Sequence, residues 1–177
     1  MSDTFMKGFL ESARAEFHRY RHLGSESIDA LSDDELNSDP YGANSVAIIV
    51  KHLHGNMVSR WTNIFTEDGE KPYRNRDAEF ESANLSKAKV KEIYDNGWSC
   101  LETALAGISE SDFSKAVVIR KEALTLVQAV ERQLTHYAYH IGQIVLIAKQ
   151  CKRNEWKSLS IAKGKSSEHS QGRYREK

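Results

Sequence analysis

Seven histidines are present in the sequence, and two of them, His136 and His140, stand four residues apart. Side chains at this spacing project from the same side of an α-helix, one turn apart, so their imidazoles could share one metal ion. His18 and His22 have the same spacing, but at about 100° per residue they lie opposite the apolar stripe of their segment. We therefore expect that pair to face water, whereas His136 and His140, on the flank of their stripe, could point between neighbouring helices.

A third ligand would have to come from another segment, which offers His52 and His54. On a helical wheel, His52 lies on the same side of its apolar stripe as His136 and His140 do on theirs. His54 lies on the other side, nearer the centre of the stripe, and could instead be a partly buried packing histidine. The spacing therefore leaves both histidines open as the third ligand. His169, close to the C-terminus, is expected in solvent.

These histidines belong to segments whose apolar residues recur at helical spacing. The sequence has only two prolines and ten glycines in 177 residues, which favours long helices. The fold class that we predict is all-α, with long helices over about residues 3–24, 44–68, 86–105 and 125–150.

Capping residues set the expected ends of these helices. Asn44 and Ser86 are suitable N-caps for the second and third helices, and Thr125 and Gln128 have the spacing of a capping box at the start of the fourth. Gly24 is expected to end the first helix, because glycine tolerates the left-handed conformation. The apolar stripe predicted for that helix is Phe5, Phe9, Ala13, Phe17 and Tyr20.

The connections are short or polar. Residues 31–36 and 108–113 each predict a capped turn before the next long helix, and residues 117–122 predict a small extended excursion before the fourth. Residues 69–84 form a polar loop without a clear period. The chain becomes rich in serine and lysine after residue 158, so we predict one domain over residues 1–165 and a polar, flexible tail over 166–177.

Composition limits the possible partners. The 25 basic residues balance the 25 acidic ones, which argues against nucleic acid as a partner, because phosphate binding normally leaves a basic footprint. No run of about 18 apolar residues could span a membrane, and the charged N-terminal segment is unlike a signal peptide. Cys100 and Cys151 form neither a CxxC motif nor a disulfide framework. We expect a cytoplasmic protein that has no membrane partner.

Two motifs resemble the DinB/YfiT-like superfamily. They are VKHLHGN at residues 50–56 and HYAYHIGQI at residues 136–144. The loop GEKPYRNRD at residues 69–77 and the segment SLSI at residues 158–161 resemble, more narrowly, one bacterial branch of that superfamily. The likeness covers about residues 5–165.

The resemblance implies a four-helix bundle, usually a homodimer, in which three histidines hold one divalent metal ion. The superfamily's ligand on the second helix matches the position of His52, which the resemblance therefore favours, with His54 as the alternative. The superfamily has a small or variable residue where this chain has His54, so His54 is a departure. Related proteins include transferases and isomerases that use low-molecular-weight thiols such as bacillithiol or mycothiol, and proteins labelled metal-dependent hydrolases.

Three imidazoles leave open coordination positions on an ion, which is typical of catalytic sites. Zinc and nickel both suit imidazole ligands. Such an ion lowers the pKa of a bound thiol or water and turns it into a nucleophile. The hypothesis is a metal-dependent enzyme that activates a low-molecular-weight thiol, as a transferase does, or water, as a hydrolase does, for reaction with a small molecule. The alternative is a helical dimer that binds metal or a small metabolite without catalysis.

Four further side chains have two interpretations each. Arg74 and Arg76 could clamp a carboxylate on a thiol cofactor, or they could simply form a solvated loop face. Gln143, one turn beyond His140, could bond to a ligand or orient a histidine, or serve as a packing amide. Asn56 has the same ambiguity one turn after His52. No residue stands out as a dedicated general base.

Overall fold

The computed structural model describes residues 3–168 of the 177-residue chain, which are mostly helical. The long helices are α1 (Asp3–Ala30), α3 (Val46–Trp61), α5 (Lys87–Ala106) and α6 (Leu126–Lys152). The shorter elements are α2 (Asp33–Asn37), α4 (Arg76–Glu79), the 3₁₀ helices η1 (Glu110–Ser114), η2 (Arg153–Glu155) and η3 (Ser166–Glu168), and the strands β1 (Ala116–Ile119) and β2 (Glu122–Thr125).

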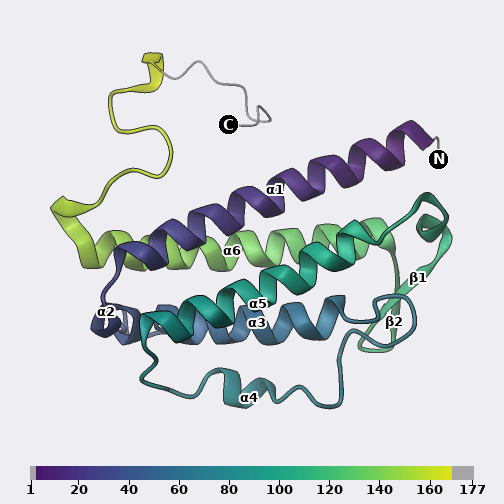
Figure 1. The fold of residues 1–177 in the computed structure, drawn as a ribbon, viewed down its shortest axis with the longest axis horizontal. Coiled ribbons are helices and arrows are strands. Elements are labelled where there is room, and N and C mark those ends of the chain that lie inside the picture. Colours follow the sequence, from purple (N-terminus) through teal and green to yellow (C-terminus); the bar gives the residue numbers. More distant parts are fainter. Residues whose placement is uncertain (1–2, 169–177) are drawn as a thin grey trace.

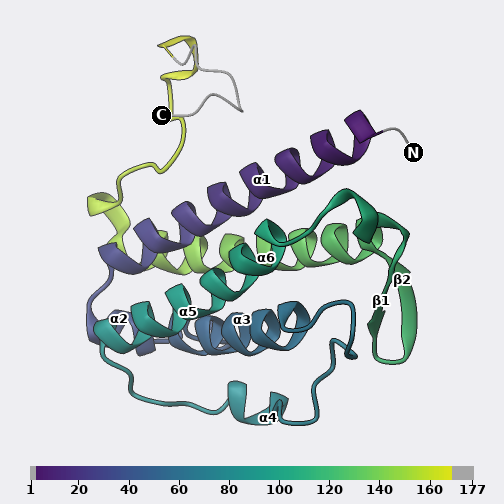
Figure 2. The same ribbon diagram turned by 45° about the vertical axis from the view of Figure 1, so that its right-hand side comes forward.

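The four long helices lie side by side and form a closed ring of contacts (Figures 1 and 2). Helix α1 packs on α6 and α5, and α3 packs on the same two helices from the other side. Strands β1 and β2 pair in an antiparallel hairpin beyond the C-terminal end of α3. The segment that carries α4 runs along the outer side of α3 (Figure 1).

Each long helix contributes one large aromatic side chain to the centre of the core. These side chains are Phe17 from α1, Trp61 from α3, Trp98 from α5 and Tyr137 from α6, and all four are at most 2% exposed. The Phe17 ring lies 6.0 Å from that of Trp61 and 5.9 Å from that of Tyr137, and Trp98 lies 5.9 Å from Tyr137. Aromatic contacts of this kind add to the stabilisation from burial alone, and here they join all four helices at one level.

The predicted caps of the third and fourth helices are confirmed. The hydroxyl of Ser86 accepts a hydrogen bond from the Lys89 backbone N–H at 3.3 Å. Thr125 and Gln128 form the reciprocal capping box at the start of α6. The predicted excursion before this helix is the β1–β2 hairpin, and the two capped connections correspond to α2 and η1.

The second helix differs from its prediction at both ends. Its N-cap is Ser45, whose hydroxyl accepts from Ile48 N–H, and not Asn44. It ends at Trp61, seven residues before the expected turn, because Thr62 leaves the helical conformation and Asn63 adopts a positive φ of 51°. The polar loop that follows is also not irregular throughout, since Asn75 caps the short helix α4.

The first helix is longer than predicted, because Gly24 does not end it. Helix α1 continues to Ala30, and Gly24 instead allows the Tyr94 side chain to approach the helix backbone. The Tyr94 hydroxyl donates to the Arg21 carbonyl at 2.8 Å beside it. Phe5, expected in the apolar stripe, is 54% exposed, so the buried face begins at Leu10.

The C-terminal segment leaves the helices after α6 (Figure 1). Of the predicted tail 166–177, residues 166–168 form η3, and residues 169–177, which include His169, lie outside the described residues. Among residues 3–168, no helix has the length and apolar character needed to cross a lipid bilayer.

The Gly24→Ala variant tests the close approach of Tyr94. A Cβ at residue 24 would lie 2.1 Å from the Tyr94 hydroxyl and 2.8 Å from Ile141 Cδ1. We expect this crowding to lower the free energy of unfolding by about 1–3 kcal/mol. Without crowding, replacing glycine by alanine inside a helix normally stabilises the fold by about 1 kcal/mol.

Gly8→Ala is the matched control in the same helix, because no atom lies within 4 Å of a Cβ built there. It should leave the stability unchanged or raise it by up to about 1 kcal/mol. Urea unfolding followed by circular dichroism measures both effects, and equal stabilisation by the two changes would contradict this account of Gly24.

Candidate metal centre

Three of the predicted histidines come together between α3 and α6. One ring nitrogen from each of His52, His136 and His140 can be chosen so that all three lie within 4.8 Å of one another. The Nε2 atoms of His52 and His136 are 3.2 Å apart, and the His140 ring centroid lies 4.9 Å from that of His52. Within residues 3–168 this is the only cluster of its kind.

The position of His136 and His140 follows from the packing of α6. Tyr137, the residue after His136, is fully buried, and its hydroxyl is fixed by two hydrogen bonds. It accepts from Trp61 Nε1 at 3.0 Å and donates to Asn56 Oδ1 at 3.0 Å. Because successive helical residues are separated by about 100°, this anchor places the two histidines on the flank that faces α3.

Glu79 of α4 holds the ring of His52. The Nδ1–H of His52 donates to Glu79 Oε2 at 2.9 Å, and His52 is only 4% exposed. Arg74 donates to both oxygens of the same carboxylate, at 2.7 and 2.9 Å. Burial alone raises the pKa of Glu79, but the hydrogen bonds from Arg74 and His52 outweigh it and keep this pKa below its usual value. The ionised carboxylate therefore keeps the proton of His52 on Nδ1 and leaves a lone pair on Nε2.

Gln143 acts on His140 in the same way. Its Oε1 lies 2.7 Å from Nδ1 of His140, and its amide nitrogen donates to the Tyr139 hydroxyl at 3.2 Å. With the Nδ1 proton engaged, Nε2 of His140 is free to act as a ligand. The contact between Gln143 and His140 is the one expected if Gln143 orients this histidine.

Burial keeps His136 and His140 uncharged at neutral pH. It lowers the pKa of His136 to about 3, with the nearby His140 and His52 acting in the same direction. It also lowers the pKa of His140 to about 4, against the opposite effect of the Gln143 hydrogen bond. Neutral imidazole is the form that binds metal ions.

The spacing of one pair of nitrogens fits two ligands of a divalent ion. At zinc–nitrogen distances of 2.0–2.1 Å, two imidazole nitrogens lie about 3.3–3.4 Å apart in tetrahedral geometry, and about 2.8–3.0 Å apart if the ligands are at right angles. The observed 3.2 Å between His52 and His136 lies between these values. At this distance a hydrogen on Nε2 of His136 can bridge the two nitrogens, and a cation could take the place of that hydrogen.

The other histidines lie elsewhere. His54 is half-buried and outside the cluster, and its Cα and Cβ lie close to Gly97 of α5. Burial lowers the pKa of His54, in agreement with a packing histidine. His18 and His22 are exposed on α1, as expected.

The two arginines predicted as a clamp have different positions. Arg76 is exposed. The Arg74 side chain is only 3% exposed, so a solvated loop face is the wrong interpretation for it, and the carboxylate that it clamps is the protein's own Glu79. Asn56 is buried and bonded to Tyr137, so it supports the core beside the site.

Sequence reasoning missed Glu79, the partner of His52. It lies 27 residues away in a loop without periodicity, and the one local signal was Asn75, a suitable cap for a short helix. Arg60, in the last turn of α3, is also buried, at 5% exposed. Gln133 is also buried, and its spacing before His136 and His140 on α6 could have placed it on their polar face.

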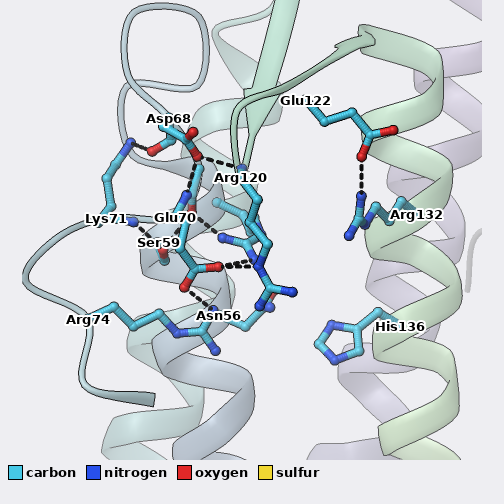
Figure 3. Close-up of polar contacts among 12 residues, drawn as sticks. Asn56, Ser59, Asp68, Glu70, Lys71, Arg74, Arg120, Glu122, Arg132 and His136 are labelled. Carbon is cyan, nitrogen blue, oxygen red and sulfur yellow. Dashed lines mark hydrogen bonds and ion pairs between the residues drawn. The ribbon is translucent and has the colours of Figure 1, made fainter.

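A polar cavity of about 220 Å³ opens beside the cluster and is lined by His52 and His136. Five arginines also line it: Arg60, Arg74, Arg76, Arg120 and Arg132. Glu70 joins two of them, accepting from Arg60 at 3.0 Å and from Arg120 at 2.8 Å. Figure 3 shows Arg120 and His136 extending from the hairpin and from α6 into the same space.

Comparison with known proteins identifies a family. The family described as "Protein of unknown function (DUF1572)" matches residues 4–165. No curated protein and no solved structure matches the chain.

The Glu70→Gln variant tests the charge network of the cavity through the pH dependence of its stability. Burial alone raises the pKa of Glu70, but hydrogen bonds from Arg120 and Arg60 lower it to about 2. A carboxyl group whose pKa is lower in the folded protein than in the unfolded chain stabilises the fold at pH values above its unfolded pKa of about 4.3. This contribution is lost as the pH falls towards 2. Wild type should therefore be more stable than Glu70→Gln at pH 7, and the difference should shrink between pH 4.5 and pH 2.

Urea midpoints of the two proteins at pH 7, 5, 3.5 and 2.5 measure this convergence. All other carboxyl groups are common to both proteins, so their titration cancels in the difference. A stability difference that stays constant over this range would show that Glu70 is not held ionised by the arginines.

Proposed function

The chain belongs to the DUF1572 family, and we propose that it is a metal-dependent enzyme whose ion is held by His52, His136 and His140. The proposal includes the DinB/YfiT-like four-helix bundle that the sequence resembles, with homodimers and a small-molecule substrate. The observation that carries it is the approach of the His52 and His136 Nε2 atoms to 3.2 Å, while Nδ1 of His52 is bonded to Glu79.

The surroundings of the histidines support an ion-binding role over a purely structural one. Glu79 and Gln143 hold the Nδ1 atoms of His52 and His140, and such outer hydrogen bonds orient imidazoles towards a metal ion. Histidines that served packing alone would not need both rings fixed in the tautomer that exposes Nε2. His54, which packs on α5, has no such partner among the described contacts.

A catalytic site also needs access for a substrate. Two of the three histidines, His52 and His136, line the cavity of about 220 Å³, so a small molecule can reach the ligand atoms. Structural metal sites are instead closed by four protein ligands. The three-histidine set with an adjoining cavity therefore favours catalysis.

When bound, the ion supplies Lewis acidity and lowers the pKa of a thiol or water that binds to it. The histidines position it, and Glu79 and Gln143 keep them in the binding tautomer. Glu79 is not a general base, because Arg74 and His52 occupy both of its oxygens. Thiol transfer and hydrolysis are the two reactions that this arrangement supports.

Metal content tests the ligand assignment. Protein purified without a histidine tag should bind about one zinc or nickel ion per chain. Alanine at His52, His136 or His140 should weaken binding by on the order of 100-fold or more, because loss of even an outer-shell partner typically costs 10–100-fold. Elemental analysis and competition with a chromophoric chelator measure both quantities.

His54→Ala is the matched control, because it removes a half-buried histidine from the same helix, two residues from His52. It should bind the ion as tightly as wild type does. Loss of metal from His54→Ala with retention in His52→Ala would reverse the assignment, and an absence of metal in all proteins would remove the proposal.

Activity is tested with the metal-loaded protein. We expect conjugate formation when it is incubated with a haloarene and one of the thiols bacillithiol, coenzyme A or cysteine, and no conjugate from His136→Ala. Mass spectrometry of the products provides the measurement. Bound metal without conjugate formation or ester hydrolysis across the panel would instead support a binding protein without turnover.

A further inference from the structure

The cavity beside the histidine cluster has an unusual lining. Its side chains are five arginines, two histidines, Asn56 and Gln133, and none of the carboxylates in the described part of the chain lines it. Its volume of about 220 Å³ is below the 300–1,000 Å³ of pockets for drug-sized ligands. A ligand of this cavity must therefore be small and polar.

The carboxylates behind the lining leave part of its charge uncompensated. Glu79 is bonded to Arg74. Glu70 is shared between Arg60 and Arg120, and Glu122 lies 3.7 Å from Arg132. These three carboxylates, and Asp68 beside Arg60, face five guanidinium groups, so the lining keeps an excess of positive charge.

Two buried atoms of the lining have no hydrogen-bond partner among residues 3–168. They are Nε of Arg60 and Oε1 of Gln133, and these residues are 5% and 4% exposed. Buried polar groups in native proteins are nearly always paired. A ligand with oxyanion acceptors would satisfy Arg60, and a hydroxyl or protonated oxygen on it would satisfy Gln133.

The hairpin turn that presents Arg120 has an unfavourable backbone. Arg120 and Lys121 have φ angles of 55° and 65°, in a position where two-residue hairpins usually have asparagine and glycine. Asp68 holds the turn by accepting from both backbone N–H groups at 2.8 Å. Strained turns that surrounding contacts maintain are concentrated at functional sites, and this one places Arg120 over the cavity (Figure 3).

We infer that this cavity is a binding site for a small dianion, in which Arg60, Arg120 and Arg132 donate to its oxyanion oxygens and Oε1 of Gln133 accepts from a hydroxyl on the same molecule. Guanidinium groups bind phosphate and carboxylate through paired hydrogen bonds. The Nη groups of Arg120 remain available, since only its Nε is bonded to Glu70. The ligand is a phosphate monoester or a dicarboxylate, and both supply two negative charges on a compact molecule.

A catalytic role for this anion site rests on the proposed function. His52 and His136 line the same cavity, so the anionic group would anchor a substrate beside the ion. Binding of the anion itself depends on the arginines, and can be measured without metal. The two proposals can therefore fail separately.

The test is calorimetric titration of chelator-treated protein with glycerol 3-phosphate, with succinate, and with glycerol as the uncharged control. We expect binding of at least one dianion and no binding of glycerol. A ten-fold preference for glycerol 3-phosphate assigns the phosphate class, and the reverse preference assigns the dicarboxylate class. Binding of neither dianion, or binding only after metal is restored, overturns the inference.

Three variants locate the site. Arg120→Gln and Arg132→Gln should each weaken binding by about ten-fold or more, the effect of losing a charge-assisted hydrogen bond. Gln133→Leu should weaken binding of glycerol 3-phosphate, whose hydroxyls can donate to Oε1. It should do so without lowering the unfolding temperature, because Oε1 has no partner to lose among residues 3–168. This variant keeps the test valid if Arg120→Gln fails to fold.

Arg19→Gln on α1 is the matched control, because it removes the same charge from a side chain that pairs with Glu16 outside the cavity. It should bind the dianion as wild type does. An equal loss of binding in Arg19→Gln and in the cavity variants would show a general charge effect and overturn the inference.

Discussion

The hydrogen-bonded hydroxyl of Tyr137 is the constraint on which the site depends. Its ring packs against Phe17 of α1 and Trp98 of α5. Its hydroxyl links Trp61 and Asn56 of α3. A buried hydroxyl that loses such partners costs about 1–3 kcal/mol, so α6 has one preferred rotation against α3. That rotation turns His136 towards His52, and the core thereby sets the geometry of the cluster.

A second constraint comes from a buried ion pair. Removing Arg74 and Glu79 from water is costly, and such pairs often add little net stability. This pair instead orients the site. Arg74 bonds to both oxygens of the Glu79 carboxylate, and this carboxylate in turn holds the ring of His52. The segment between α3 and α5 thus serves the site although it lies outside the ring of long helices.

The sequence predicted the features that depend on interactions between residues close together in the chain. Caps such as Ser86 and Thr125 could be identified because their hydrogen bonds join residues three apart, and the shared face of His136 and His140 follows from helical geometry. Gly24 was misjudged because a side chain 70 residues away, that of Tyr94, decides its environment. For the same reason spacing could not choose between His52 and His54, since Glu79, which holds only the former, is distant in sequence.

The long connection after α3, residues 62–86, carries one further consequence. Extended irregular connections are usually where proteases cut and where inserted residues are tolerated. Here Lys71 and Glu79 are buried, as is the side chain of Arg74. Cleavage or insertion in this connection would therefore expose these groups to solvent and break the contact that holds His52. The exposed stretch at residues 39–43 has no such anchors among its described contacts, and it is the place where the chain can be cut or lengthened without disturbing the histidines.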